Sequence, residues 1–400
     1  MSEMSYLEKL LDGVEVEWKT LGQTCKIETG KLNANAAVDD GEYMFFTTAK
    51  ETSKIDKFRW DTEALLIAGN ANVGEVKHYI GKFEAYQRTY VLTNFDENVS
   101  VRFLYFVLSH SLKKYLEERT NSAAMTYIVL STLENFPIPI PCPDNPEKSL
   151  AIQSEIVRIL DKFSELTAEL TAELTAELNM RKKQYNYYRD QLLSFDESSV
   201  EWKTLLEACD YVDYRGKTPK KTQSGIFLVT AKNIRMGYID YHASQEFISE
   251  EDYAIVMRRG LPKKGDVLIT TEAPCGFVAQ VNRENIALAQ RVIKYRSKNT
   301  QLSNSFLKHY LLGSQFQDKL MQAATGSTVK GIKGSRLHQL KIPIPSKVEQ
   351  DRIVAILDKF DTLTNSITEG LPREIELRQK QYEYYRDLLF SFPKPETVSN

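Results

Sequence analysis

The chain of 400 residues consists of two similar halves, and this internal repeat restricts the possible folds more than any other feature. The sequence VEWKTL at residues 16–21 recurs at residues 200–205, and IPIP at residues 138–141 recurs at residues 342–345. Between these segments the halves are far less alike. We therefore expect two globular units that share one fold but differ in surface, as in a protein that recognises two different ligands.

A helical segment follows each IPIP sequence. IVRILDKF at residues 156–163 returns as IVAILDKF at residues 353–360, and RKKQYNYYRDQLLSF at residues 181–195 returns as RQKQYEYYRDLLFSF at residues 378–392. Both pairs are 197 residues apart, so the two helical segments have equal length. The arrangement predicts a pseudo-two-fold molecule within one chain.

Each globular unit is expected to have a mixed α/β (α+β) fold. Short apolar runs punctuated by Gly, Asn and Asp predict strands at residues 43–48, 64–68, 88–92, 267–271 and 290–295. Apolar residues at helical spacing predict one helix near the end of each unit, over residues 101–118 and 305–323. Because proline donates no backbone hydrogen bond, the IPIP segments are expected to be extended exits rather than central strands.

The segment before the second unit contains TAEL three times in succession, at residues 167–178. Leucines four residues apart form one apolar stripe, and the flanking pattern predicts a helix over residues 147–194, about 70 Å long. The equal segment after the second unit is its expected antiparallel partner in a coiled-coil spacer. Gly370 and Pro372 are expected to kink or split that second helix. Two amphipathic helices packed on separate cores are the alternative.

These elements divide the chain into a first globular domain at residues 1–146, a central helical spacer at 147–196, a second globular domain at 197–346, a C-terminal helical spacer at 347–392 and a tail at 393–400. A hydrophobic content of 42% and a charged content of 26% are typical of globular proteins. The sequence has no apolar run of about 18 residues and no signal-peptide pattern, so we expect a cytoplasmic protein.

Motifs of catalytic and metal sites are missing from the sequence. The four cysteines and five histidines lack metal-ligand spacing. Walker-type and dinucleotide-binding loops, a nucleophile elbow and a zinc-protease motif are absent, as are the Asn-Pro-Pro-aromatic motif of amino-methyltransferases and a glycine-rich S-adenosylmethionine loop. We therefore expect no catalytic residue, no metal site and no cofactor bound by this chain.

Charge is distributed unevenly, although the formal net charge of the whole chain is −2. Residues 211–341 contain 21 Lys and Arg against 10 Asp and Glu, whereas residues 22–136 contain 13 against 15. Basic residues of the second unit accompany polar ones at residues 214–221 and 325–333, which suits contacts with DNA phosphates and bases. A solvated basic surface without a ligand is the alternative, and the first unit has no such signal.

Each of the two divergent units is closed by IPIP and by a helix that ends in KQYxYYRDxLxSF, and the central spacer contains tandem TAEL. Over the whole chain, this arrangement resembles the specificity subunit of Type I restriction–modification systems. The TAEL repeats are similar to those of the IC subfamily, in which the number of copies sets the spacing of the target. The resemblance implies a DNA-reading subunit without catalytic activity, whose two target recognition domains each read one half of a bipartite sequence.

The resemblance also implies the partners. Double-stranded DNA would be bound together with two modification subunits, which carry S-adenosylmethionine, flip adenine and methylate it. Motor and nuclease subunits, which use ATP and Mg, would join for restriction, and no membrane partner is expected. One TAEL repeat lengthens a helix by about 6 Å, against about 3.4 Å for a base pair. Deletion of a repeat is therefore expected to shorten the gap between half-sites by one or two base pairs. We predict one, because each base pair also rotates the half-site and so resists a larger step.

Candidate DNA contacts are polar residues that can donate to phosphates or pair with base edges. In the first unit they are Thr29, Lys31, Lys50, Asn70, Asn72, Gln87, Arg88 and Thr126. In the second unit they are Arg215, Lys217, Lys232, Thr271, Gln290, Arg291, Lys330 and Lys333. The Gln-Arg pairs at 87–88 and 290–291 stand out because they match across the repeat, although a shared role in maintaining the fold is an equal alternative.

Candidate partner-docking residues lie on the repeated helices, since aromatic residues and arginine commonly anchor interfaces. They are Tyr185, Tyr188, Arg189, Tyr382, Tyr385 and Arg386, and packing between the two helices is the alternative for the tyrosines. Two other functional classes stay open. A self-contained two-domain DNA-binding regulator would bind a specific site without partners, and a helical scaffold would show no salt-dependent DNA binding.

Overall fold

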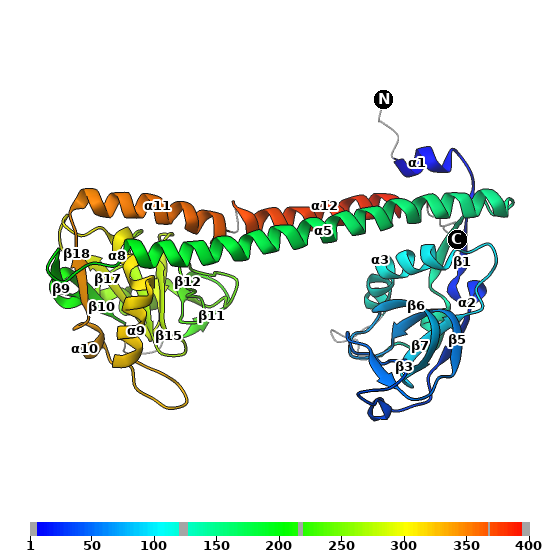
Figure 1. The fold of residues 1–400 in the computed structure, drawn as a ribbon, viewed down its shortest axis with the longest axis horizontal. Helices are drawn as coiled ribbons and strands as arrows, with labels where there is room; N and C mark the ends of the chain where they lie inside the picture. The colour runs from blue at the N-terminus through cyan, green and yellow to red at the C-terminus, as the bar shows by residue number, and fades with distance from the viewer. Residues whose placement is uncertain (1–5, 120–126, 215–218, 367–368, 394–400) are drawn as a thin grey trace. The chain divides into compact units, whose positions relative to one another are not determined.

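The computed structural model describes residues 6–119, 127–214, 219–366 and 369–393, and Figure 1 shows the fold. The chain forms two compact units. Unit 1 comprises Met1–Leu170 and Arg378–Asn400, and unit 2 comprises Thr171–Leu377. Each unit combines a β-sheet region with helices, so the expected mixed α/β fold of both halves is confirmed.

The globular part of unit 1 contains a six-stranded sheet in the order β2-β7-β5-β6-β3-β4. Its strands are β2 (Lys26–Thr29), β3 (Tyr43–Phe46), β4 (Ser53–Ile55), β5 (Trp60–Ala68), β6 (Val76–Ala85) and β7 (Thr89–Thr93). Its helices are α1 (Tyr6–Leu11), α2 (Leu21–Thr24), η1 (Ala34–Ala36), α3 (Val101–Arg119) and α4 (Leu130–Glu134). Neighbouring strands are antiparallel except β3 and β6, which are parallel.

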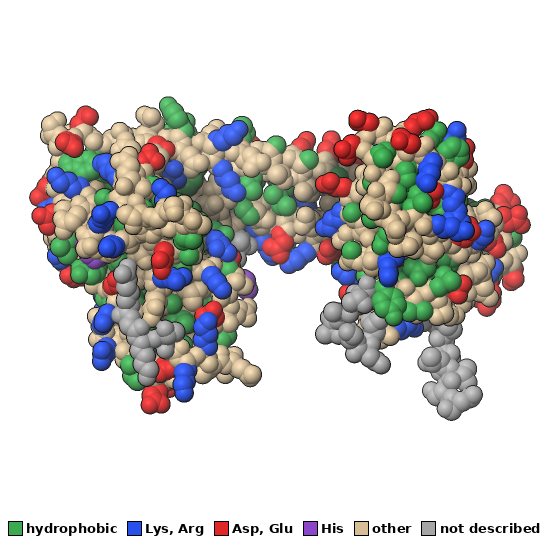
Figure 2. Space-filling view, turned by 90° about the horizontal axis from the view of Figure 1, so that it is seen from below, with side chains coloured by type: hydrophobic (Ala, Val, Ile, Leu, Met, Phe, Trp, Pro, Cys, Tyr) green, Lys and Arg blue, Asp and Glu red, His purple; other side chains and the backbone are tan. Residues whose placement is uncertain are grey.

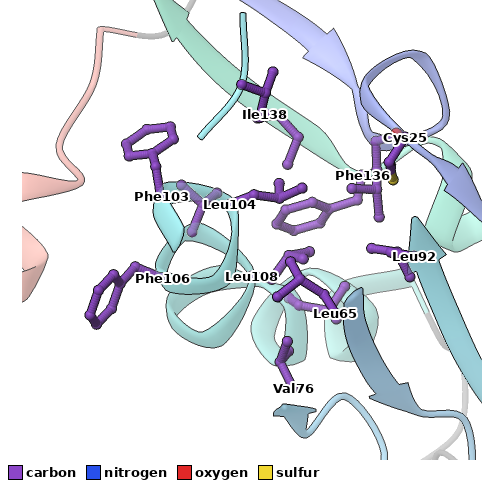
Figure 3. Close-up of a cluster of buried hydrophobic side chains, with 14 of the residues drawn as sticks. Cys25, Leu65, Val76, Leu92, Phe103, Leu104, Phe106, Leu108, Phe136 and Ile138 are labelled. Carbon is purple, nitrogen blue, oxygen red and sulfur yellow. Dashed lines mark hydrogen bonds between the residues drawn. The ribbon is translucent and has the colours of Figure 1, made fainter. Parts of the chain in front are cut away.

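Helix α3 closes the hydrophobic core of unit 1. Figure 3 shows Leu104 and Leu108 of α3 around the ring of Phe136, and all three side chains are buried. Phe103 lies on another side of the helix, where its ring centroid is 6.2 Å from that of Phe392. The core of unit 1 therefore includes residues from the far end of the chain.

The globular part of unit 2 contains two four-stranded sheets, in the orders β10-β17-β14-β15 and β11-β13-β12-β16. The strands are β10 (Cys209–Asp213), β11 (Lys221–Thr222), β12 (Ile226–Val229), β13 (Phe247–Ile248), β14 (Val267–Thr271), β15 (Cys275–Gln280), β16 (Ile286–Leu288) and β17 (Val292–Ser297). The helices are α6 (Leu205–Ala208), α7 (Glu250–Val256), η2 (Met257–Arg259), α8 (Asn304–Leu312), α9 (Ser314–Ala323) and α10 (Gly334–Leu337). In unit 1, strand β6 pairs with both β5 and β3. In unit 2, two strands take its place, since β15 pairs with β14 and β16 pairs with β12. This division explains why two sheets replace one.

The repeated segments at the boundaries of each globular part pair with each other. The pairs are β1 (Val16–Thr20) with β8 (Pro137–Pro141) and β9 (Glu201–Thr204) with β18 (Lys341–Ile344), both antiparallel. Trp18 lies opposite Pro139, as Trp202 lies opposite Pro343. Each ladder has only two strands, so the prolines interrupt no bond to a third strand. The expectation that IPIP is not a central strand is confirmed.

One helix, α5 (Pro146–Leu192), follows the globular part of unit 1, and its 47 residues correspond to about 70 Å. The long helix expected over residues 147–194 is therefore confirmed. Its first part belongs to unit 1 with the end of α12 (Leu371–Leu389), and its last part belongs to unit 2 with α11 (Lys347–Asn365). Gly370, with φ +80°, precedes α12, so the expected split of the second helical segment is also confirmed. No described helix is long and apolar enough to cross a membrane.

The single helix expected over residues 305–323 is wrong, because α8 and α9 are separate helices. Gly313 has an extended backbone, with φ −67° and ψ 148°, and ends α8. The Gln317 side chain then donates to the carbonyl oxygen of Leu311 at 2.7 Å, which satisfies a group at the end of α8. The apolar periodicity continues on both sides of the break, which conceals the break in the sequence.

A buried glutamine connects each globular part to the helix that follows it. Gln153 of α5 accepts from the amide of Ser100 at 2.8 Å, and Gln350 of α11 accepts from the amide of Ser303 at 2.8 Å. Each glutamine also donates to the carbonyl oxygen two residues before that serine, at 2.8 and 2.7 Å. Both side chains are fully buried. The same local structure therefore joins helix and globular part in both units.

Candidate nucleic-acid interface

A hollow of about 320 Å³ at one end of the sheet of unit 1 contains three of the residues that the sequence suggested. Its lining residues are Thr29, Gly69, Gln87, Arg88, Tyr90, Tyr127 and Ile128. The amide of Gly69 donates to the carbonyl oxygen of Arg88 at 2.8 Å, and the amide of Ile128 donates to that of Gly69 at 2.8 Å. These bonds hold the turn between β6 and β7, which presents the exposed side chains of Gln87 and Arg88.

Unit 2 has a hollow of about 410 Å³ at the equivalent place. Its lining residues are Thr271, Glu272, Gln290, Arg291, Thr325, Gly326, Val329, Gly331, Ile332 and Lys333. The amide of Thr271 donates to the carbonyl oxygen of Arg291, and the amide of Ile332 donates to that of Thr271, both at 2.8 Å. The backbone bonds repeat those of unit 1, so the two Gln-Arg pairs occupy the same structural position.

The loop beside each hollow has the same unusual backbone. Ala71 and Ala273 have φ values of +57° and +47°, and Gly74 and Gly276 have φ values of +80° and +84°. Residues other than glycine seldom adopt this left-handed conformation. The shared conformation shows that the two units keep one loop geometry although their sequences diverge.

The two loops carry different side chains at the position of Asn70 and Glu272. In unit 1, Asn70 forms a β-bridge with Tyr127, and in unit 2, Glu272 forms the equivalent bridge with Gly331. Oε1 of Glu272 is 2.5 Å from Nε of Arg291. The side-chain oxygen of Asn70 is buried and has no hydrogen-bond partner among the described residues. The same loop therefore carries an amide in one unit and an ion-paired carboxylate in the other.

Seven residues suggested by the sequence line the two hollows: Thr29, Gln87, Arg88, Thr271, Gln290, Arg291 and Lys333. Six others do not line them: Lys31, Lys50, Asn70, Asn72, Lys232 and Lys330. Asn72 has a contact that maintains the fold, because its side chain donates to the carbonyl oxygen of Thr48 at 2.8 Å. Thr126, Arg215 and Lys217 lie outside the described residues.

Ten lining residues are not among these candidates: Gly69, Tyr90, Tyr127, Ile128, Glu272, Thr325, Gly326, Val329, Gly331 and Ile332. The last five of them lie in the basic segment 325–333 that the sequence indicated. Glu272 lies within residues 268–276, which match residues 66–74 across the repeat. An alignment of the two halves therefore places Glu272 at the position of Asn70 and could have identified it. Tyr127 and Val329, with exposed fractions of 56% and 60%, come from segments without such a match.

Part of the positive charge of unit 2 lies inside the protein. Nζ of Lys294 is buried and 3.8 Å from Asp266, and Arg296 donates to both carboxylate oxygens of Asp266 at 2.6 Å. Burial lowers the pKa of Lys294. These groups hold β14 and β17 together, and the exposed Lys and Arg side chains are scattered over the face of unit 2 seen in Figure 2.

The tyrosines suggested for partner docking also contact aromatic or polar side chains of their own unit. The ring of Tyr188 stacks on Phe360 at 5.7 Å in unit 2, and the ring of Tyr385 stacks on Phe163 at 5.5 Å in unit 1. Tyr185 is buried beside Phe360, and the guanidinium of Arg189 lies over its ring at 5.5 Å.

Unit 1 repeats this arrangement at the end of α12. The hydroxyl of Tyr382 is 3.0 Å from Oγ of Ser164, and the guanidinium of Arg386 lies over the Tyr382 ring at 5.9 Å. Sequence reasoning missed the most exposed aromatic residues of these helices, Tyr187 and Tyr384, whose exposed fractions are 62% and 60%.

Among the residues that the structure describes, no group of three or more His, Cys, Asp or Glu side chains is arranged to hold a metal ion.

Comparisons with known proteins identify the family. The family model for the Type I restriction modification DNA specificity domain matches residues 13–180 and 202–377. The chain is 44% identical to the Type I restriction enzyme EcoR124I/EcoR124II specificity subunit of Escherichia coli over 100% of both chains. It is 37% identical to the Type I restriction enzyme EcoprrI specificity subunit of Escherichia coli, over 92% of this chain and 93% of the relative.

A solved structure supports the same fold. A chain from work on complex assembly and conformational transition of the type I R-M system superimposes with a TM-score of 0.62 at 15% identity, covering 94% of this chain and 98% of the other. The repeated motifs, the paired hollows, the family model and the relatives agree, and the chain belongs to the family of Type I restriction–modification specificity subunits.

Proposed function

We propose that this chain is the DNA sequence-recognition subunit of a Type I restriction–modification enzyme and has no catalytic activity of its own. The observation that carries the proposal is the pair of equivalent hollows, each with an exposed Gln-Arg pair, in a chain of the specificity family. Glutamine and arginine can each form two hydrogen bonds with a purine edge in the major groove.

Each globular domain reads one half of a bipartite asymmetric target, the first over residues 1–146 and the second over residues 197–346. The two hollows share backbone bonds but differ in their other lining residues, as expected if each reads different bases. Exposed Lys and Arg around them contact phosphates, which set the position of the domain without carrying sequence information.

The helical segments at residues 147–196 and 347–392 set the distance between the half-sites. The three TAEL repeats lie within the uninterrupted helix α5. Removal of four residues shortens an α-helix by about 6 Å and turns its end by about 40°, because each residue contributes about 100°. By length alone this change lies between one and two base pairs of about 3.4 Å each. Its rotation of about 40° matches the rotation of about 35° for one base pair, so we expect a step of one base pair.

The test is adenine methylation mapping in cells that contain this chain and its modification subunit, beside a variant that lacks residues 175–178. We expect a two-part motif, with a gap that is one base pair shorter in the variant and with unchanged half-sites. A specific site bound tightly by the chain alone, without bipartite methylation by the assembled complex, would favour the regulator instead.

Two modification subunits, each with bound S-adenosylmethionine, dock on the equivalent helix surfaces, and motor and nuclease subunits with ATP and Mg join for restriction. The exposed rings of Tyr187 and Tyr384 occupy matching positions on α5 and α12, which suits two copies of one partner. We expect Tyr187→Ala and Tyr384→Ala each to remove one modification subunit from the complex, measured as its mass in solution. Tyr238→Ala, at an exposed ring outside these helices, is the matched control. An unchanged mass in both variants would contradict this docking site.

A further inference from the structure

The ion pair between Glu272 and Arg291 has no evident structural task. Both side chains line the hollow of unit 2, and their exposed fractions are 44% and 57%. Exposed ion pairs contribute little to folding stability. The backbone of Arg291 has φ +72°, an uncommon conformation for a residue other than glycine, and functional sites often contain such residues. The pair is therefore better explained by a ligand than by the fold.

The surrounding residues make room for the carboxylate. Glu272 bridges Gly331, where the equivalent residue of unit 1 is Tyr127. A Cβ atom at Gly331 would be in van der Waals contact with Glu272, 3.4 Å from its Cβ and 3.7 Å from its Oε2, so glycine leaves this side of the carboxylate open. Thr271 fixes the other partner, because its amide and its hydroxyl donate to the carbonyl oxygen of Arg291 at 2.8 and 3.3 Å.

A carboxylate beside the hollow is unfavourable for phosphate contacts, since both groups are anionic. The DNA group that a carboxylate can bind in the major groove is an amine, and the N4 amine of cytosine is the usual partner of Glu. In the ion pair, Glu272 contacts Nε of Arg291. The two terminal nitrogens lie on the other edge of the guanidinium, from which they can donate to a base. They match O6 and N7 of guanine, which lie next to cytosine N4 in the same base pair.

We propose that Glu272 and Arg291 together read one C·G base pair in the half-site of the second domain. Glu272 accepts a hydrogen bond from cytosine N4, and Arg291 donates to guanine O6 and N7. The inference rests on the proposed function and adds the residues and the base pair that it recognises. Because unit 1 has Asn70 at the position of Glu272, the first domain lacks this combination.

The experiment uses the full chain assembled with its modification subunit and compares methylation of DNA that carries every base pair at each position of the second half-site. We expect one position at which the wild-type complex requires C·G. Glu272→Ala and Arg291→Ala should each reduce the preference at that position about tenfold or more, since one such contact discriminates by this amount. Glu272→Ala removes the acceptor from a side chain that is partly exposed, and an unchanged first half-site reports that the variant is folded.

Base analogues separate the two contacts. A duplex with 7-deazaguanine, which lacks N7, should weaken methylation by the wild-type complex but not by Arg291→Ala. A duplex with 2-pyrimidinone, which lacks the N4 amine of cytosine, should weaken methylation by the wild-type complex more than by Glu272→Ala. Lys264→Ala removes an exposed charge outside the hollow and should leave the preference unchanged.

Two results overturn the inference. Bipartite methylation with an unaltered preference in Glu272→Ala would show that the pair reads no base, and a sensitive position other than C·G would show that it reads different groups. Absence of bipartite methylation by the assembled wild-type complex contradicts the proposed function itself, so the two failures are distinguishable.

Discussion

Replacement of Gln350 by leucine should loosen unit 2 while leaving unit 1 intact. The fully buried Gln350 side chain accepts from the amide of Ser303 at 2.8 Å and donates to the carbonyl oxygens of Gln301 and Pro345 at 2.7 and 2.8 Å. Leucine has a similar size but leaves these three backbone groups without their partner. A buried polar group that loses its partner costs about 1–3 kcal/mol. Since water can reach some of these groups, we expect a total loss of roughly 3–6 kcal/mol in the free energy of unfolding of unit 2.

Hydrogen–deuterium exchange measured by mass spectrometry is the suitable assay, because it reports on each unit separately. A loss of about 3 kcal/mol accelerates exchange of the most protected amides roughly 150-fold. The acceleration should occur in peptides from α8 and α11 of unit 2. Gln153→Leu is the matched variant and should accelerate exchange in α3 and the first part of α5 instead. Acceleration of less than about fivefold in unit 2, or an equal effect in both units, would refute the reasoning.

Two further predictions follow from buried groups. Burial lowers the pKa of His338, so below about pH 6.5 the unfolded chain binds more protons than the folded chain, and the stability of unit 2 should fall as the pH falls. Thermal unfolding between pH 7.5 and 5.5 should therefore show a smaller pH slope in His338→Gln than in the wild type or in a variant of the exposed His242. An identical slope would contradict this. Burial raises the pKa of Cys25 and of Cys209 to about 12. Iodoacetamide at pH 8 should therefore modify the partly exposed Cys142 of the native chain before either of them. Equal labelling of all three cysteines would contradict the burial of Cys25 and Cys209.

Local pattern and internal repetition predict much of the fold. The helix α5 and the interruption at Gly370 follow from periodicity and from residue types, which act within a few turns of the chain. The pairing of β1 with β8 does not follow from the sequence, because it joins segments that are more than 100 residues apart. Gly313 was concealed for a different reason, since the apolar pattern of α8 continues in α9.

The candidate site is predictable only in part. The two Gln-Arg pairs match across the repeat, and the structure places them in equivalent hollows. Tyr127 and Val329 enter these hollows from loops that diverge between the halves, so neither periodicity nor repetition identifies them. Glu272 carries a charge that opposes a contact with phosphate, and a search for basic residues therefore passes over it.

The contribution of the chain's last helix to unit 1 has a consequence for protein synthesis. Leu389 and Phe392 are buried in the core of unit 1, and the indole of Trp18 donates to the carbonyl oxygen of Pro393 at 2.9 Å. The ribosome adds all residues of unit 2, 171–377, before it adds Leu389 and Phe392, so unit 2 can close its core while that of unit 1 still lacks one side. A frameshift or nonsense codon shortly before residue 389 would therefore damage the domain that was translated first.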